Sequence, residues 1–373
     1  MRKRLDIFLS ITLLILFYSS TCLAQELSAE ENYPTDIQKY ELSLMGHSTK
    51  ISPRAVMQMD NNWEILIACL SEKTKDELKA NDISFVDSQL LILNVMRLLD
   101  VQENRLKTVM PILGSKKMKS LRKKMRDLSL KIEPELRSGV DALKIELTKI
   151  DRKENVYTIL FSYVLDELAL DFFYEEGLIE SSNLSAEKPF WAGTYWAVYP
   201  RREFSCGTDK MELPEISIML NWSNVLGDKM WEGFNITNLR LLYNDLIKYG
   251  RVVNDELRKK LSTYQIFDSS GNLTVPIIEQ KENNQLFQKC KSLALKASQQ
   301  FLDNVDLKSL IEEYQLYDET KALAVSYHEW MWEYMDYLEE KEIVKKPFAF
   351  SNPNEAKPED IGALLFIVKT SNK

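Results

Sequence analysis

The sequence lacks two features that would point directly to a class of partner: an excess of positive charge and, after Tyr18, a long apolar run. Its formal net charge is −8, with 48 Lys and Arg against 56 Asp and Glu, which argues against a surface that neutralises phosphates. A helix needs about 20 predominantly apolar residues to cross a bilayer. The sequence therefore predicts a soluble, folded mature protein, with no nucleic acid among its expected partners.

Cysteine is also scarce, with 4 residues in 373. Three of them, Cys69, Cys206 and Cys290, lie beyond the N-terminal segment that ends at Ala24. In an oxidising compartment an odd number leaves at least one thiol unpaired or paired between chains, so the disulfide pairing stays open. Cys69 and Cys290 lie on apolar helical stripes, which predicts that both are small buried hydrophobes.

Histidine is the scarcest residue type with metal-binding chemistry, with 2 residues in the chain. His328-Glu329 could begin a zinc-protease pattern, but the second histidine would have to follow at the position of Trp332. The sequence therefore predicts no metal site and no cofactor. The same segment carries four acidic residues at helical spacing: Glu329, Glu333, Asp336 and Glu340. They leave two alternatives, a carboxylate metal site or a solvated face.

The N-terminal segment, 1–24, has the features of a secretory signal. A cationic start at residues 2–4 precedes an almost unbroken apolar run at residues 7–18, and small or neutral residues follow before Gln25. This predicts cleavage near Gln25 and export to the periplasm or the extracellular space. A retained membrane anchor and a lipidated Cys22 are the alternatives.

Two stretches of the sequence resemble each other, which indicates an internal duplication. One runs from Pro111 to about Val198, and the other from Pro276 to about Val368. A shift in residue number of 276 − 111 = 165 aligns their first parts, and the shift changes to 164 and then to 169 where turn residues cluster. Chance similarity between two amphipathic helical segments is the alternative.

Each copy is predicted to contain short helices, a β-hairpin, two long helices and a closing strand. In the first copy the short helices fall at 63–70, 75–79 and 89–97, before a β-prone segment at 106–113. This element order resembles that of a winged helix, and the resemblance covers about a third of each unit and implies no functional residue. The predicted fold class is therefore helix-dominated α+β, a tandem duplication of a winged-helix-like unit.

The duplication divides the chain into five predicted segments: a signal peptide (1–24), a polar leader (25–52), repeat unit one (53–200), an ordered connector (201–233) and repeat unit two (234–373). The two long helices of each unit carry apolar seams that need a partner surface. We expect them to pack against the hairpin of their own unit, with the closing strand completing its sheet. Each unit would then have a core of its own.

Cys206 is the candidate for covalent chemistry. It lies in the connector without an apolar stripe to bury it, and Arg201 and Arg202 are near enough in sequence to favour a thiolate. A Cys–His enzyme would need His328 or His47 within hydrogen-bonding distance of the thiol. The predicted catalytic residues are therefore Cys206 and His328, and a structural or disulfide-forming cysteine is the alternative.

Aromatic and basic side chains supply the candidates for binding. Trp191 and Trp196 have no aromatic counterpart in the second copy at the shift of 169, which favours a copy-specific role or a place at the edge of the core. The helix expected at residues 116–131 predicts either contact with an anionic membrane or polyanion, or a solvated face. Its basic candidates are Lys119, Lys123 and Arg126.

A second aromatic set lies at helical spacing and could stack flat ligands or fill a core: Tyr327, Trp330, Tyr334 and Tyr337.

The function predicted from all these features is that of an exported, non-enzymatic binding or assembly protein of the cell envelope. Its partner would be a protein or an envelope component that the sequence does not identify. A thiol enzyme that depends on Cys206 is the alternative, and membrane contact is expected only through a lipidated Cys22 or the helix 116–131.

Overall fold

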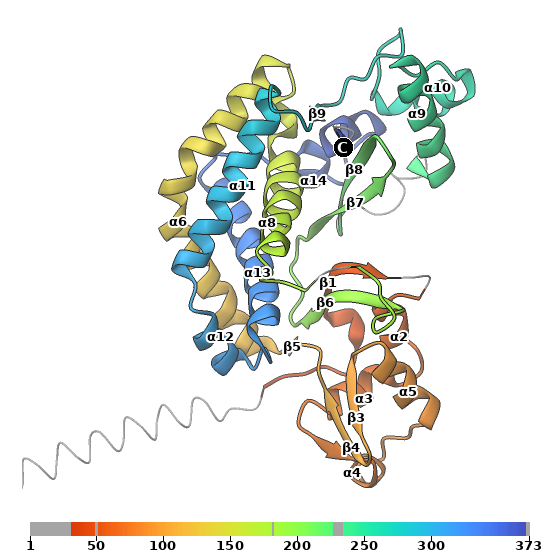
Figure 1. The fold of residues 1–373 in the computed structure, drawn as a ribbon, viewed down its shortest axis with the longest axis vertical. Helices are drawn as coiled ribbons and strands as arrows, with labels where there is room; N and C mark the ends of the chain where they lie inside the picture. The colour runs from red at the N-terminus through yellow and green to blue at the C-terminus, as the bar shows by residue number, and fades with distance from the viewer. Residues whose placement is uncertain (1–30, 49–50, 181–182, 227–233, 371–373) are drawn as a thin grey trace, which may run out of the picture.

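Four long helical segments form a bundle along one side of the molecule, at the left of Figure 1. The first half supplies α6 (Ser115–Lys149) and the continuous run of α7 (Val156–Thr158), the π-helix η3 (Ile159–Leu168) and α8 (Ala169–Glu175). The second half supplies α11 (Gln285–Asn304) and α13 (Glu319–Glu340). This computed structural model describes residues 31–48, 51–180, 183–226 and 234–370, so the predicted signal peptide lies outside the described residues.

The apolar seam of α6 is buried in the bundle, as its spacing predicts. Residues at steps of three and four along the helix belong to the bundle core: Met118, Leu121, Met125, Leu128 and Ile132. The helix passes through Pro134 and continues to Lys149 because Leu136, Val140 and Leu143 keep the same spacing and are also buried. The helix therefore extends well beyond the seam that identified it.

The long helices of the two halves pack against each other rather than within each half. Both α6 and η3 lie against α11 and α13, and one continuous cluster of buried side chains joins all four segments. The expectation that each unit has its own core is wrong for the long helices. An apolar seam specifies only that a complementary surface must cover it, and here the other half supplies that surface.

Two sheets lie beside the bundle (Figure 1). The first has the order β1-β6-β5, built from β1 (Glu41–Ser48), β6 (Trp191–Val198) and β5 (Ile112–Leu113). The second has the order β7-β8-β10-β9, built from β7 (Cys206–Glu212), β8 (Ile216–Ser223), β10 (Leu365–Lys369) and β9 (Ile277–Glu279). In both, the closing strand pairs antiparallel on one side, β6 with β1 and β10 with β8, and parallel on the other, β6 with β5 and β10 with β9.

Each sheet separates the bundle from a smaller module. Along β6, Trp196 and Val198 belong to the bundle core, whereas Tyr195 and Ala197 belong to the core of the first module. Along β10, Phe366 and Val368 belong to the bundle core, and Leu365 and Ile367 to that of the second module. Alternate side chains point to opposite faces of a strand, so both closing strands are buried on both faces.

The first module precedes the bundle in the chain and is mixed in structure. It contains α2 (Pro53–Met57), α3 (Asn62–Ala68), α4 (Lys75–Ala80) and α5 (Asp87–Val95), and a sheet of order β2-β4-β3 from β2 (Lys73–Thr74), β4 (Arg105–Thr108) and β3 (Leu99–Gln102). Thr74 and Glu77 form a capping box at the start of α4. The short helices predicted here are present, and a hairpin is formed by β3 and β4. The β-prone segment at 106–113 divides between β4 and β5, and the expectation that the closing strand completes the sheet of the hairpin is wrong, because β6 pairs with β1 and β5 instead.

The second module is smaller. It contains α9 (Ile236–Tyr249), α10 (Asp255–Leu261) and η5 (Ser262–Tyr264), with an isolated antiparallel bridge between Phe267 and Leu273. Gly250 ends α9 in the left-handed conformation. The remaining short segments are η1 (Ile37–Lys39), η2 (Lys153–Asn155), α12 (Leu307–Tyr314), α14 (Phe348–Ser351) and η6 (Pro358–Leu364).

Two glycines let β1 and β6 cross closely. Gly46 and Gly193 face each other in the ladder and have φ of 141° and 130°. A Cβ at Gly46 would lie 2.1 Å from the carbonyl oxygen of Ala192, and one at Gly193 would lie 2.0 Å from that of Met45. Only glycine fits at either position without movement of the strand pair.

The coarse prediction of a mostly helical α+β fold is confirmed. The segment predicted as a polar leader, residues 25–52, supplies β1, an edge strand of the first sheet. The connector predicted as ordered supplies β7 and β8. Within the described ranges no helix has the length and apolar character to cross a membrane.

Candidate functional site

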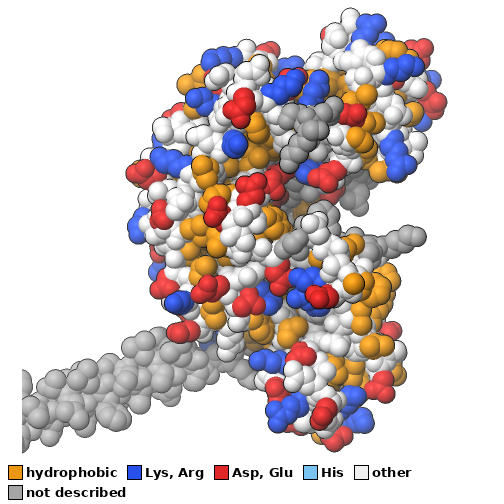
Figure 2. Space-filling model, viewed as in Figure 1, with side chains coloured by type: hydrophobic (Ala, Val, Ile, Leu, Met, Phe, Trp, Pro, Cys, Tyr) orange, Lys and Arg blue, Asp and Glu red, His pale blue; other side chains and the backbone are white. Residues whose placement is uncertain are grey.

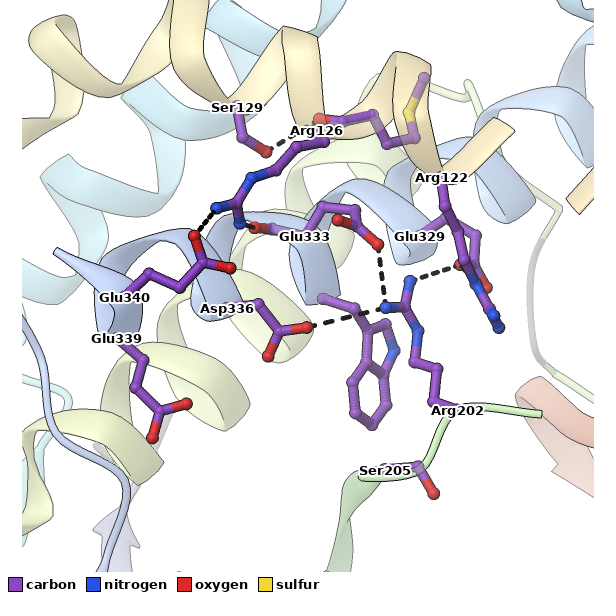
Figure 3. Close-up of polar contacts among 12 residues, drawn as sticks. Arg122, Arg126, Ser129, Arg202, Ser205, Glu329, Glu333, Asp336, Glu339 and Glu340 are labelled. Atoms are coloured by element: carbon purple, nitrogen blue, oxygen red, sulfur yellow. Dashed lines mark hydrogen bonds and ion pairs between the residues drawn. The ribbon is translucent and has the colours of Figure 1, made fainter. Parts of the chain in front are cut away.

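The most strongly charged contact of the bundle joins α6, α13 and the start of the connector (Figure 3). Arg202 lies between carboxylates of α13, with Nη2 2.6 Å from Oε2 of Glu329 and Nη1 2.9 Å from Oε1 of Glu333. Arg122 of α6 approaches the same Glu329 oxygen at 3.3 Å. The Glu329 side chain is 1% exposed and that of Arg202 is 8% exposed. We call these four residues the buried ion cluster.

Electrostatic complementarity fixes the charge states in the buried ion cluster. Burial alone would raise the pKa of Glu329, but the guanidiniums of Arg202 and Arg122 outweigh it and hold that pKa below its usual value. Burial would lower the pKa of Arg202, but the charges of Glu329 and Glu333 outweigh burial and raise that pKa above its usual value. For Glu333, burial prevails and raises the pKa. The cluster is therefore a tightly paired structural network, with Glu329 held ionised.

The acidic and basic stripes noticed in the sequence are thus two sides of one contact. Arg126 pairs with Glu340 and Lys124 with Glu313 of α12, in addition to the pairs of Arg122. Neither alternative for the acidic stripe describes Glu329, which is neither solvated nor part of a metal site. Within the described ranges there is no group of three or more histidine, cysteine or acidic side chains that could hold a metal ion.

The predicted binding residues of α6 divide into two kinds. Lys119 and Lys123 are exposed to solvent on the outer side of the helix. Arg126 is half-buried, with its guanidinium 5.1 Å from the centre of the Tyr337 ring. Figure 2 shows acidic and basic side chains interspersed over one face of the molecule, rather than a broad basic surface.

Cys206 is buried, contrary to the expectation from its local sequence. Its side chain is 2% exposed and packs in the bundle core, because β7 turns it towards the helices. Its sulfur lies 3.8 Å from the hydroxyl of Tyr157, and burial raises the pKa of the thiol far above its usual value. Arg202, expected to favour a thiolate, pairs with carboxylates instead. All three cysteines in the described ranges are free and buried.

His328 lies on α13 and faces tryptophans. Its Nδ1 accepts a hydrogen bond of 3.1 Å from Nε1 of Trp332, and its ring centre lies 5.0 Å from that of Trp196. Burial lowers the pKa of His328 to about 4, so the ring is neutral near pH 7. Since Cys206 has Tyr157 as its hydrogen-bond partner and His328 has Trp332, no hydrogen bond joins the two predicted catalytic residues in the described part of the chain.

Both predicted binding tryptophans are core residues. The indole nitrogen of Trp191 donates to the carbonyl of Met96 in the first module. Trp196 is fully buried in the bundle core. It directly precedes Ala197, the residue paired with β5, just as Phe366 directly precedes Ile367, the residue paired with β9. Trp196 and Phe366 thus occupy matching positions in their two sheets, one residue away from the pairing that the shift of 169 gives.

The aromatic stripe of α13 is also core. All four of its residues belong to the bundle core: Tyr327, Trp330, Tyr334 and Tyr337. The rings of the first three form edge-on, tilted and stacked contacts with aromatic neighbours, and the ring of Tyr337 lies beside the guanidinium of Arg126. Of the two alternatives left by the sequence, a ligand platform and a packed interior, the structure has the second.

A cleft of about 350 Å³ lies between the two sheets, and we call it the inter-sheet cleft. The start of β1 and the preceding turn form one wall, and Ser205 with the end of β8 forms the other. Its lining residues are Ile37, Gln38, Tyr40, Glu41, Leu42, Arg54, Gln58, Arg201, Ser205, Trp222, Ser223 and Asn224. The cleft is bounded mainly by polar side chains from segments far apart in the sequence.

Local hydrogen bonds fix the second wall of the inter-sheet cleft. Asn224 accepts from the backbone N–H of Ser205 at 2.8 Å and donates to the carbonyl of Glu203 at 2.8 Å. Trp222 lies over Gly207, where a Cβ would come within 2.4 Å of the indole ring. The wall is therefore pre-formed, and Gly207 leaves the space that the indole occupies.

The buried ion cluster anchors the first wall of the cleft. Glu41 at the start of β1 accepts from the backbone N–H of Arg202 at 3.1 Å and lies 3.7 Å from Nη2 of Arg122. Burial and the charge of Glu329 raise the pKa of Glu41. These contacts hold β1 and the connector beside α6 and α13, so the bundle sets the width of the cleft.

Sequence reasoning missed the lining of the cleft. Arg201 is distinguished in the sequence only by its closeness to Cys206. Arg54 and Trp222 belong to no functional motif or periodic pattern. Their only sequence signal is that each is a large polar or aromatic side chain in a segment without helical periodicity. Folding brings the three segments together around one cavity.

The fold and the cleft define a mixed α+β protein with a helical bundle, two flanking sheets and a pre-formed polar cavity between them. A comparison of the chain with protein-family models, curated proteins and solved structures finds no match.

Proposed function

We propose that the protein is an exported, non-enzymatic binding or assembly protein of the cell envelope, with the inter-sheet cleft as its binding site. The observation that carries this proposal is the lining of the cleft, which combines exposed guanidiniums, amides and an indole on a fixed frame. Export is supported by the signal-like residues 1–24 alone. Membrane contact would come only from a lipidated Cys22 or from exposed residues of the basic helix, including Lys119 and Lys123.

The alternative, a thiol enzyme that depends on Cys206, has less support. A nucleophilic thiol needs an accessible thiolate, and burial acts against both requirements here. The neighbouring Tyr157 hydroxyl is itself buried, and burial raises its pKa well above the usual value, so it is not a base near pH 7. The binding role is therefore the function that the geometry supports better.

We also propose that the two halves are copies of one winged-helix-like unit. The matching antiparallel and parallel partners of β6 and β10 support it, as does the position of each sheet between the bundle and a small module. The strand registers imply a shift in residue number of 367 − 197 = 170 at the closing strands. The three short helices α3, α4 and α5, which follow α2 and precede the β3–β4 hairpin, support the winged-helix-like description of the first module.

The pairing of the long helices supports an intertwined arrangement of the two copies. If α6 corresponds to α11, and η3 with α8 corresponds to α13, then the α6–α13 contact corresponds to the α11–η3 contact. The α6–α11 and η3–α13 contacts each correspond to themselves. This is the pattern that a two-fold axis along the bundle would produce, as in a symmetric dimer joined into one chain.

Site-specific crosslinking in the producing cell tests the binding role. A photo-crosslinking amino acid at Val225, exposed beside the cleft, should capture an envelope component, whereas the same group at Ile145, exposed on α6, should not. Equal capture at both positions, or none at Val225, would contradict the proposal. The mass of the recovered protein tests export separately, because the mature chain should lack residues 1–24 or carry a lipid at Cys22.

A further inference from the structure

We propose that the inter-sheet cleft binds an anionic sugar, one or two rings in size, through its carboxylate or phosphate group. This inference names the ligand class for the binding role proposed above and rests on it. The volume of the cleft, about 350 Å³, lies near the lower end of the range for small-molecule sites, roughly 300–1,000 Å³. A space of that size suits a mono- or disaccharide rather than a globular partner.

Two guanidiniums in the cleft supply the charge that an anionic group requires. Arg54 and Arg201 line the cavity and are exposed, and in the described part of the chain neither forms an ion pair. The one carboxylate of the lining, Glu41, is engaged with Arg122 and with the backbone of Arg202. Guanidinium groups bind carboxylate and phosphate with paired hydrogen bonds.

A buried tyrosine belongs to the fixed frame of the cleft. Tyr40 lines the cleft, is 4% exposed and has no hydrogen-bond partner for its OH among the described residues. Trp63 and Tyr199 pack on its ring, with centres 4.7 and 5.5 Å away, in the core of the first module. Since the OH is closed to solvent, Tyr40 holds the shape of this wall and is not itself a ligand contact.

The remaining lining suits the ring of a sugar. Trp222 is 36% exposed and presents its indole to the cleft, and the apolar face of a sugar ring packs well on such a surface. The side-chain amides of Gln38 and Gln58 can each donate to and accept from ring hydroxyls. The cleft thus combines recognition of charge at Arg54 and Arg201 with contacts suited to a ring.

Calorimetric titration of the mature protein with glucuronic acid, glucose 6-phosphate and glucose tests this inference. We expect saturable binding of at least one anionic sugar and none of glucose. The double substitution Arg54→Gln and Arg201→Gln should weaken that binding at least about tenfold, because it replaces charge-assisted hydrogen bonds by neutral ones, which are roughly half as strong. The matched control, Lys291→Gln with Lys308→Gln, removes two exposed charges from α11 and α12 and should bind as the unmodified protein does.

Three results would overturn the inference: no binding of either anionic sugar up to about 10 mM, equal binding of glucose, or undiminished binding by the Arg54 and Arg201 variant with a native circular dichroism spectrum. The crosslinking at Val225 separates this failure from failure of the binding role. Capture retained without sugar binding removes only the ligand class, whereas loss of both removes the binding role as well.

Discussion

At the scale of single residues, the buried ion cluster is where one substitution has the largest expected effect. Glu329 is 1% exposed and contacts two guanidiniums. Removal of one partner from a buried pair leaves an uncompensated charge, whereas replacement of both partners by apolar groups is often close to neutral. Arg202 differs from an ordinary surface arginine because three carboxylates lie within 4 Å of its guanidinium, at 2.6, 2.9 and 3.8 Å.

Glu329→Met should therefore lower the free energy of unfolding by about 3–5 kcal/mol, since Arg202 and Arg122 would lose their shared partner. The double substitution Glu329→Met with Arg202→Met should be less destabilising than the single one. Urea denaturation followed by circular dichroism measures both. Lys119→Met on the exposed side of α6 is the control and should change stability by less than about 0.5 kcal/mol. A double variant less stable than Glu329→Met would contradict this description.

His328 gives the protein a pH dependence of definite sign. Its pKa is about 4 in the fold, against 6.5 in the unfolded chain, so the unfolded chain binds more protons between these values. The His328 contribution to stability is present in full above about pH 6.5 and is lost as the pH falls towards 4. It amounts to about 3 kcal/mol at most, from a shift of about 2.5 units at 1.36 kcal/mol each.

His328→Gln tests this because glutamine can accept the Trp332 hydrogen bond without titrating. The difference in unfolding free energy between the two proteins should change between pH 7 and pH 4 and stay constant above pH 7. Comparison of the variant with the parent is needed because burial raises the pKa of Asp166 to about 7, which gives a contribution of the opposite sign in the same range. A difference that does not vary with pH would show that the ring is solvated.

The thiols should be unreactive in the native protein. Cys69, Cys206 and Cys290 are buried, and burial raises the pKa of each. Alkylation by iodoacetamide at pH 8, followed by mass spectrometry, should modify none of the three in buffer and all of them in urea. Rapid modification of Cys206 alone in native protein would restore the thiol-enzyme alternative.

At the scale of elements, periodicity predicted the helices well and the strand β1 poorly. The helical positions of α9, α10 and α13 follow from caps and apolar spacing, which depend on neighbours three or four residues away. β1 lies in a mostly polar segment. Its place in the sheet depends on its ladder with β6, which follows it only after the first module and two long helical segments. No local pattern could have indicated that pairing.

The crossing of β1 and β6 depends on its two glycines. Gly193→Ala should destabilise the protein by more than about 1 kcal/mol, since alanine is strained at φ 130° and its Cβ would collide with the carbonyl of Met45. Gly362→Ala is the matched control, because a Cβ there meets nothing within 4 Å. Thermal melting of the two variants compares them, and equal melting temperatures would show that the strand pair is not closely packed.

At the scale of the whole molecule, the long helices of each half depend on the other half. Since α6 packs on α11 and α13, a chain that ends after β6 would leave its apolar seam exposed. Residues 25–200 and 201–373, produced separately, should each aggregate or stay partly folded. Produced together they should form a soluble one-to-one complex with the helical content of the intact chain. A monomeric, cooperatively folded half would contradict the intertwined arrangement.

The sequence by itself determined the helical segments, the closing strands and the two charged stripes, because those features depend on spacings of a few residues along the chain. Only the tertiary structure decided that the stripes pair with each other, that Cys206 is buried and that Arg54, Arg201 and Trp222 share one cleft. Each of these outcomes is a contact between segments that lie far apart in the sequence. Local patterns specify that a face must be covered or a charge paired, and the packing of the whole chain specifies by what.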